Sequence, residues 1–524
     1  MASAARPATG DRGPTAPVAD VAALPARNHA ALVVGAMMAS LLQVLDSTIA
    51  NVALPHMQAN LGASPDTITW VLTSYIIATA VAMPITGWLA DRFGARRLFI
   101  VSVAGFVLSS MACGLAQNLE EMVLFRALQG VSGAFISPLS QSFMLDSTKP
   151  SRQPTVMAIW SAGMMIGPIM GPILGGWLTE NANWRWVFYV NVPVGALALA
   201  MLLAGLPTRP LRERKFDLAG FAMIGLALAS IQLLLDRGPQ VDWFEAGEAW
   251  IYAGVAISGL WMAAIHLGTS RNPLVPPSLF ADRNFTIAFF LMFLIGVVMF
   301  ATMALLPPML QRLLGYDVID TGYVMAPRGI GVLVSMQISG FLLRRQLDPR
   351  ILIASGFVIS NIAMWEMMHW SLAVDRSHII WTGLVQGLGL GLIFMPLNLT
   401  AFATLPPQMR TDGSSMLNLA RNIGSSIGIS IVTAVWGGNV QAMHQDLGSH
   451  VTSATSSVVD VSTIDRYQNL GDVALQMLDA EINRQAAMVA YVDDFYLIFW
   501  TTIAVLPLVF FMRKVVRPGM GPPR

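Results

Sequence analysis

Three arginines interrupt long apolar runs of the sequence. Arg126 lies in "MVLFRALQGVSGAF" (122–135), and Arg328 and Arg421 lie in similar runs. If such a run crosses a membrane, its guanidinium costs about 2.5–3.5 kcal/mol unless another group pairs with it. Asp46, in "LLQVLDSTIANVALP" (41–55), has the opposite charge and a comparable expected depth. We therefore predict a buried Asp46–Arg126 pair, with extension of Arg126 toward an interface or a carbonyl as the alternative.

An ion pair of this kind can move a proton. Surroundings of low dielectric constant favour the neutral form of a carboxyl group, whereas a neighbouring guanidinium favours the carboxylate. Opening and closing the pair would therefore put a proton on Asp46 or take one off. The sequence predicts proton coupling by Asp46 and Arg126.

Other chemistries lack the residues they need. The sequence contains no G-x-x-x-x-G-K-[ST] loop for ATP, no H-E-x-x-H and no paired C-x-x-C. Its single cysteine, Cys113, cannot form an internal disulfide. We expect neither an enzyme nor a bound cofactor, metal ion or nucleic acid, so a proton gradient would have to drive the protein's work.

The elements that must position these residues are membrane-spanning helices. Only 12% of the residues are charged and 55% are hydrophobic, whereas a soluble chain carries about 25% charged residues. Runs of about 20 apolar residues are long enough to cross the hydrocarbon layer. We predict fourteen spans, at 30–54, 68–90, 97–117, 121–145, 155–178, 184–206, 217–236, 249–268, 285–310, 322–343, 350–370, 378–404, 415–437 and 494–512.

The basic residues predict how these spans are oriented. Most of the 31 Lys and Arg residues fall in the loops that share one side with the N-terminus, which is typical of the cytoplasmic side. We therefore expect a cell (inner) membrane protein with both termini cytoplasmic. Residues 1–28 are predicted to be a disordered tail, and residues 513–524 form a second tail.

The sequence repeats itself at a spacing near 255 residues. "LADRFGARR" has a degenerate copy in "LLRRQLDPR", and "LQGVSGAFISP" has one in "VQGLGLGLIFMP". This predicts a six-helix bundle at 29–206, a linker with two extra helices at 207–284, and a second six-helix bundle at 285–512. Val298 and Gly383 replace Asp46 and Arg126 in the second copy, which argues against a purely architectural role for the pair. Repeated halves are typical of secondary transporters, whose substrate site lies between them.

Two segments have the composition expected of helix contacts that move during gating. In "GWLADRFGARR" (87–97), the residues predicted to form a gate are Gly87, Asp91, Arg92, Gly94 and Arg97; a basic anchor on the inner leaflet is the alternative. In the fifth span, small residues recur every fourth position and two prolines should bend the helix. These residues are Gly163, Gly167, Pro168, Gly171, Pro172 and Gly175, and static packing is the alternative to gating.

Further polar residues at middle depth are candidates for a substrate cavity, with helix–helix hydrogen bonding as the alternative role. They are Gln43, Asn51, Tyr75, Gln129, Arg328, Asn398 and Arg421.

These motifs together resemble the major facilitator superfamily over essentially the whole chain. "GWLADRFGARR" resembles its loop between the second and third helices, and "RALQGVSG" its fourth-helix arginine motif. "GMMIGPIMGPILGG" resembles its antiporter motif, and "LDSTIANVALP" the first helix of the fourteen-helix drug:proton antiporter branch, the EmrB/QacA group. The resemblance implies proton-coupled export of lipophilic or cationic small molecules by alternating access. An importer or exporter of a specific metabolite with the same fold remains the alternative.

The segment 439–492 is predicted to be a long outer loop that holds an amphipathic helix at the membrane surface. We keep as a hypothesis that it docks to a periplasmic adaptor and an outer-membrane channel. The expected partners are otherwise small-molecule substrates, protons and the lipid bilayer.

Overall fold

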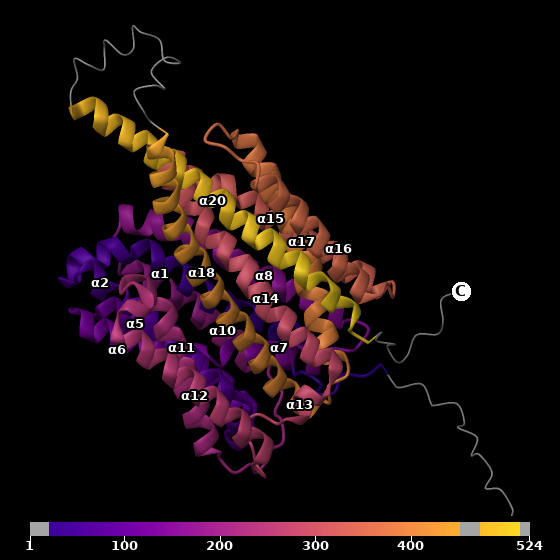
Figure 1. Ribbon diagram of the computed structural model, residues 1–524. Coiled ribbons are helices and arrows are strands. Elements are labelled where there is room, and N and C mark those ends of the chain that lie inside the picture. Colours follow the sequence, from indigo (N-terminus) through magenta and orange to yellow (C-terminus); the bar gives the residue numbers. More distant parts are fainter. Residues whose placement is uncertain (1–19, 451–471, 514–524) are drawn as a thin grey trace, which may run out of the picture.

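The computed structural model describes residues 20–450 and 472–513, and every regular element in these ranges is a helix. Figure 1 shows the helices packed side by side in one elongated bundle. The first part of the chain forms α1 (His29–Leu61), α2 (Pro65–Ile68), α3 (Trp70–Ala82), η1 (Met83–Ile85), α4 (Thr86–Leu89), η2 (Ala90–Gly94), α5 (Ala95–Leu115), α6 (Leu119–Gly133), α7 (Ile136–Ser147), α8 (Gln153–Asn181), α9 (Trp186–Tyr189) and α10 (Asn191–Gly205).

The remainder of the chain continues in the same way. Its elements are α11 (Leu218–Arg237), η3 (Gly238–Gln240), η4 (Trp243–Glu245), α12 (Gly247–Thr269), α13 (Ser278–Ala281), α14 (Arg283–Pro308), η5 (Met309–Leu313), α15 (Val318–Arg344), α16 (Pro349–Met367), α17 (Arg376–Ala403), η6 (Pro407–Met409), α18 (Arg410–Ser449) and α20 (Asp472–Phe510).

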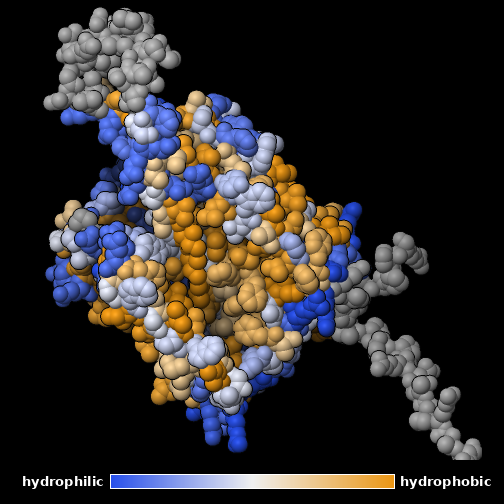
Figure 2. All heavy atoms as spheres, viewed as in Figure 1, coloured by the Kyte–Doolittle hydropathy of each residue, from blue (hydrophilic) through white to orange (hydrophobic). Residues whose placement is uncertain are grey.

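Within the described residues, 13 helical segments are long and apolar enough to cross a membrane. One of them, Asp66–Leu115, has 50 residues, which as a straight helix would measure about 75 Å against about 30 Å of hydrocarbon. The chain turns within it at Gly94, whose φ of 92° is a conformation that favours glycine. This segment therefore holds two of the predicted spans, and the prediction of an all-helical membrane fold is confirmed. In Figure 2 the middle of the visible face is mostly apolar.

Side chains at the helix starts explain where several spans begin. Asn28 accepts a hydrogen bond from the Ala31 amide at the start of α1, and Asn118 accepts one from the Glu121 amide at the start of α6. Asp282 and Asp375 cap α14 and α17 in the same way. Each cap satisfies a backbone donor that the first turn leaves free.

The first and second halves of the repeat use glycine in the same manner. On α8, a Cβ added to Gly167 would crowd Val44 of α1, and on α18 a Cβ added to Gly424 would overlap the Phe293 carbonyl of α14. The helix pairs α1·α8 and α14·α18 therefore approach closely at equivalent positions of the repeat.

The two extra helices lie against both halves. α11 packs on α3 and on α12, and the Ser430 hydroxyl of α18 donates to the Leu235 carbonyl of α11 at 3.0 Å. α11 thus contacts helices from the first and the second half of the chain.

Two segments differ from their predicted structure. Residues 20–28, expected to be disordered, bond to the bundle: the Leu24 amide donates to the Asp146 carbonyl at 2.8 Å, and the Arg27 amide donates to the Gly205 carbonyl. Of the predicted outer loop 439–492, residues 439–449 instead continue α18 and residues 472–492 begin α20. The rest of these predicted segments, 1–19 and 451–471, and residues 514–524 lie outside the described residues.

The helical extensions form because the two helices pair with each other. Asn439 donates to Asp493 at 3.2 Å, and His444 contacts Asp479 at 2.9 Å. Figure 1 shows α18 and α20 running on from the bundle at this end, so the described residues of the segment extend two helices of the bundle and form no separate surface helix. Tertiary pairing outweighs the polar composition that predicted a loop.

Candidate functional site

The structure brings Asp46 and Arg126 together in the interior of the first half. Nη1 of Arg126 donates to Oδ2 of Asp46 at 2.7 Å, and both side chains are fully buried. Nε of Arg126 also donates to the Val71 carbonyl of α3 at 3.1 Å. The ring of Tyr75 lies 4.5 Å from the guanidinium carbon, which adds a cation–π contact. Arg126 is therefore held by α1 and α3 and does not extend to an interface.

Two amides complete the surroundings of the Asp46 carboxylate. Gln129, one turn after Arg126, donates to Oδ1 of Asp46 at 2.9 Å and accepts from Arg126 at 2.9 Å. Asn191, at the start of α10, donates to the same Oδ1 at 2.7 Å and to Ser110 of α5 at 2.9 Å. Asp46 thus accepts from three donors, the set that fits an ionised carboxylate. The four-residue cluster Asp46, Arg126, Gln129 and Asn191 is called the buried cluster below.

The other predicted cavity residues of the first half separate into two groups. Gln43 is buried and accepts from the Ser137 hydroxyl of α7 at 2.6 Å. Tyr75 is buried against Arg126. Asn51 is exposed, and its amide donates to the Ser47 carbonyl of its own helix. Asn51 therefore belongs to neither the buried cluster nor the pocket described below.

The loop motif 87–97 takes part in a contact between the two halves. Arg214, in the linker, donates to Asp91 and to Asp412 of α18, both at 3.2 Å. A Cβ added to Gly87 would overlap the Asp412 carboxylate. Glycine at position 87 is what allows α18 to approach this closely.

A second group of charges lies on the same side. Asp146 at the end of α7 accepts from Arg209 of the linker at 2.6 Å and from Arg410 of α18 at 2.7 Å. Arg209 also donates to Thr411 at 2.9 Å. The six charged residues of the two groups, called the cross-half network, are Asp91, Asp146, Arg209, Arg214, Arg410 and Asp412. They join the halves at the end of the bundle that carries the loop motif, here called the motif end.

The arginines of the motif itself stay outside this network. Arg92 and Arg97 are exposed and form no hydrogen bond or ion pair with the part of the chain that the structure describes. Gly94 supplies the turn between η2 and α5. Of the predicted gate, only Gly87 and Asp91 therefore take part in the contact between halves.

The glycine face of α8 packs within its own half. Cβ atoms added to the four glycines would meet α1: Met37 beside Gly163, Val44 beside Gly167, Thr48 beside Gly171 and Ile49 beside Gly175. In this conformation the glycine face therefore lies against α1 of its own half, and its predicted role in gating stays a prediction. The opposite half is met by the other face, where Ile173 approaches Gly322 of α15. Pro168 and Pro172 lie inside the continuous helix α8.

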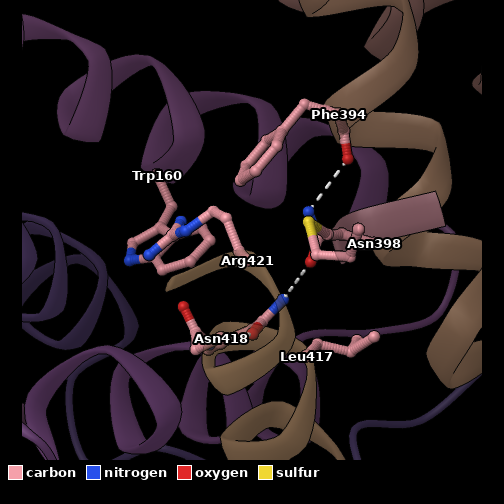
Figure 3. A pocket seen from close by; sticks show the side chains of 8 residues that line it. Trp160, Phe394, Asn398, Leu417, Asn418 and Arg421 are labelled. Carbon is pink, nitrogen blue, oxygen red and sulfur yellow. Dashed lines mark hydrogen bonds between the residues drawn. The ribbon is translucent and has the colours of Figure 1, made fainter. Parts of the chain in front are cut away.

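A central pocket lies between the two halves (Figure 3). Its lining comes from α7, α8, α14, α17 and α18, and consists of Gln141, Trp160, Met292, Phe394, Asn398, Leu417, Asn418 and Arg421. Its side chains leave almost no room between them even for a water molecule, whereas a typical ligand pocket encloses roughly 300–1,000 Å³. Two of the predicted cavity residues, Asn398 and Arg421, are therefore in one site, which is contracted in this conformation.

A hydrogen bond across the pocket joins residues at equivalent positions of the repeat. Gln141 of α7 donates to Asn398 of α17 at 2.6 Å, and the two are 257 residues apart. This spacing is the one that relates "LQGVSGAFISP" to "VQGLGLGLIFMP". The halves therefore meet at corresponding residues on either side of a pseudo-symmetry axis.

Arg328 of α15 lies elsewhere in the second half. Its side chain is 6% exposed, and Nη2 donates weakly to the Met299 carbonyl at 3.4 Å. Its Nη1 has no hydrogen-bond partner among the described residues. Arg328 does not line the central pocket.

Sequence reasoning missed several residues that complete these sites. The repeat contained a signal for Gln141, because its equivalent Asn398 was already a candidate. Asn191 and Trp160 carry no charge and stand in apolar runs, so nothing in the pattern singled them out. The linker arginines Arg209 and Arg214 were counted only for the side of the membrane on which they lie.

Comparison with known proteins places this chain in a family. Residues 36–429 match the sequence profile of the Major Facilitator Superfamily. The chain is 34% identical over 493 residues to "Multidrug export protein EmrB" of Escherichia coli, covering 92% of this chain and 95% of that protein. It is 31% identical over 488 residues to "Fatty acid resistance protein FarB" of Neisseria gonorrhoeae, covering 92% and 96%.

Solved structures agree on the fold. The human organic anion transporter MFSD10 (TETRAN) superposes with a TM-score of 0.57 at 14% identity, covering 90% of this chain and 99% of that one. The proton:xylose symporter XylE gives a TM-score of 0.58 at 12% identity, covering 91% and 96%. Sequence profile, relatives and fold together show that the chain belongs to the Major Facilitator Superfamily, in the group that contains EmrB.

Proposed function

We propose that the protein exports lipophilic small molecules in exchange for protons, by alternating access between its two halves. The observation that supports this most strongly is the buried cluster: a carboxylate and a guanidinium 2.7 Å apart and fully enclosed. A charge inside a membrane protein is costly and is retained where it has work to do. The names of the relatives, which refer to multidrug export and fatty acid resistance, support a lipophilic substrate.

In this proposal Asp46 carries the proton and Arg126 responds to it. When Asp46 is ionised, it holds Arg126, Gln129 and Asn191 together, and with them α1, α6 and α10. A proton on Asp46 cancels its charge and removes the strongest of these bonds, since charge-assisted hydrogen bonds are about twice as strong as neutral ones. The helices can then move relative to one another. Proton entry is thereby linked to the conformational step.

The cross-half network would hold the motif end shut in the present conformation. Arg214 bonds acids of both halves, and Asp146 accepts from Arg209 and Arg410. We propose that the motif end is cytoplasmic, as the distribution of basic residues indicates, and that the membrane is the cell (inner) membrane. Substrate would then enter when this network separates and leave when it forms again.

The test is transport by the purified full-length chain in proteoliposomes. An imposed pH gradient should drive export of a lipophilic fluorescent probe, with 8-anilinonaphthalene-1-sulfonate and ethidium examined in parallel. Asp46→Asn keeps the size of the side chain but cannot titrate, so gradient-driven transport should be lost while insertion persists. Full gradient-driven transport of either probe by Asp46→Asn would contradict the proposal.

A further inference from the structure

Arg328 of α15 is a buried cation without a counter-charge. Its side chain is 6% exposed, and its Nη1 has no acceptor among the described residues. Its one bond is the 3.4 Å contact of Nη2 with the Met299 carbonyl. Asp320, the acid on the same helix, pairs instead with Arg376 of α17. A buried charge is costly unless it is paired, and a guanidinium does not give up its proton. The described part of the second half therefore lacks an anion at this place.

The repeat relates Arg328 to the buried cluster of the first half. Arg328 follows Tyr75 by 253 residues, and Gly387 follows Gly130 by 257 residues. A Cβ added to Gly130 would overlap the Tyr75 carbonyl. In the same way, a Cβ added to Gly387 would overlap the Arg328 carbonyl. Helices α15 and α17 therefore pack as α3 and α6 do, and Arg328 has the position from which Tyr75 covers Arg126.

The carboxylate of the first half has no counterpart beside Arg328. The guanidinium of Arg328 reaches α14 at the Met299 carbonyl, and the neighbouring Val298 occupies the register of Asp46. In the first half, this level of α1 supplies a carboxylate 2.7 Å from Arg126. The second half thus keeps a guanidinium directed at this level, on a different helix, and has an apolar side chain in place of the acid.

A glutamine of the second half also lacks the partners that its equivalent has. Gln386 corresponds to Gln129, which donates to Asp46 and accepts from Arg126. Gln386 is fully buried and its Oε1 accepts from no described residue. Its Nε2 makes only long contacts, 3.5 Å to a hydroxyl of α14 and 3.9 Å to a sulfur of α16. It lies one turn from Gly383, which packs against the Arg328 side chain. A buried cation and a buried amide are therefore both left with unused N–H donors.

We propose that a chloride ion binds Arg328 and takes the place of the missing carboxylate. A guanidinium offers up to five N–H donors, and hydrogen bonds from a charged donor are the strong ones. Chloride accepts such bonds from any direction, so it needs no planar partner. The amide of Gln386 would supply a further donor. The site is separate from the central pocket, which Arg328 does not line. The inference goes beyond the proposed export function and does not depend on the substrate.

A bound chloride would differ from Asp46 in its response to protons. A carboxylate takes up or releases a proton as its surroundings change. Chloride is the anion of a strong acid and stays ionised. The first half would therefore hold an ion pair that protons can open, and the second half an ion pair of constant charge. This difference would confine proton coupling to the first half.

The experiment measures binding of radioactive chloride to the full-length protein in nanodiscs, in gluconate buffer of constant ionic strength. The unaltered protein should bind chloride saturably, and bromide should compete. Arg328→Gln should weaken chloride binding at least about tenfold, which corresponds to about 1.4 kcal/mol. Two controls should bind as the unaltered protein does. Arg421→Gln changes the arginine of the central pocket, and Arg376→Gln changes an exposed arginine paired with Asp320.

A second variant supplies the missing acid. Val298→Asp places a carboxylate in the register of Asp46, where it should pair with Arg328 and abolish chloride binding. Chloride should raise the melting temperature of the unaltered protein and leave that of Val298→Asp unchanged, because the variant carries its own counter-charge. Unchanged chloride binding by Val298→Asp would contradict the assigned position of the ion.

Absence of saturable chloride binding by the unaltered protein would overturn the inference, and this measurement needs no variant to fold. Full binding by Arg328→Gln would overturn it as well, and so would a loss of binding in Arg421→Gln alone. None of these measurements involves transport, so their outcome is independent of the test of the export function.

Discussion

The carboxylate of Asp412 occupies the space that a Cβ on residue 87 would need. The two residues belong to opposite halves of the chain, and Arg214 of the linker bonds Asp412 at 3.2 Å on the same side. Contact between the halves at the motif end therefore depends on one missing methyl group. A substitution as small as alanine should act on the conformational equilibrium.

Gly87→Ala should favour the conformation in which the motif end is open. Overpacking costs about 1–3 kcal/mol, and about 1.4 kcal/mol changes a two-state ratio tenfold. The measurement is labelling of Ser142→Cys, which lies in this contact beside Thr411, with a membrane-impermeant maleimide. Gly254→Ala is the matched control, because a Cβ there meets nothing within 4 Å. Equal labelling in both glycine variants would show that the Asp412 contact does not control the motif end.

Arg126→Lys should transport slowly, and Arg126→Ala should not transport at all. Lysine keeps the charge but lacks the planar fork that bonds Asp46, Gln129 and Val71 together. Alanine leaves a buried carboxylate unpaired, which costs about 3–5 kcal/mol. Initial rates in proteoliposomes at equal protein content measure both effects. The assigned role fails if alanine performs as well as lysine.

Asn191→Leu should weaken proton coupling and spare substrate binding. It removes one of three donors to Asp46, and a hydrogen bond to a charged group contributes about 1.5–3 kcal/mol. Gradient-driven transport should fall at least about tenfold. Equilibrium dialysis should show unchanged binding of 8-anilinonaphthalene-1-sulfonate, because Asn191 does not line the central pocket. Asn60→Leu serves as the control, since that exposed amide bonds only its own helix. Comparable transport rates for the two variants would show that Asn191 of the buried cluster is not needed for proton coupling.

Gly171→Ala should lower thermal stability, because the added methyl group would overlap the Thr48 hydroxyl of α1. Thr48 also donates to the Gly167 carbonyl at 3.2 Å, so the same change disturbs a bond between α1 and α8. The double variant Gly171→Ala, Thr48→Ala should recover much of the loss. Melting of the purified protein tests this, and the ratio of labelling from the two membrane sides tests gating. A changed labelling ratio with unchanged stability would show that this face takes part in gating.

The membrane-spanning helices and the Asp46–Arg126 ion pair could be predicted from the sequence, for simple physical reasons. A run of apolar residues must become a helix in lipid, because every backbone polar group has to bond within the segment. Asp46 and Arg126 are opposite charges at similar depth, and pairing is the arrangement that reduces the cost of both.

The features that could not be predicted from the sequence depend on contacts between residues far apart in the chain. Arg209 and Arg214 are ordinary basic loop residues until folding places them between acids of the two halves. The packing partner of Gly171 is decided by which helix lies next to α8, and glycine spacing carries no information about that. The helical extensions of α18 and α20 require each other, so the composition of either one alone favoured a loop.

Helix α18 is long enough for a small tilt to displace its far end by a large distance. It runs without interruption from Arg410 to Ser449, 40 residues, or about 60 Å at 1.5 Å per residue. One end carries Asp412 in the cross-half network, and Arg421 lies roughly a quarter of the way along. If α18 tilts as a rigid body near the pocket, its far tip moves farther than the network end does. A spectroscopic label near Ser449 would therefore report, as a larger displacement, whether the motif end is open.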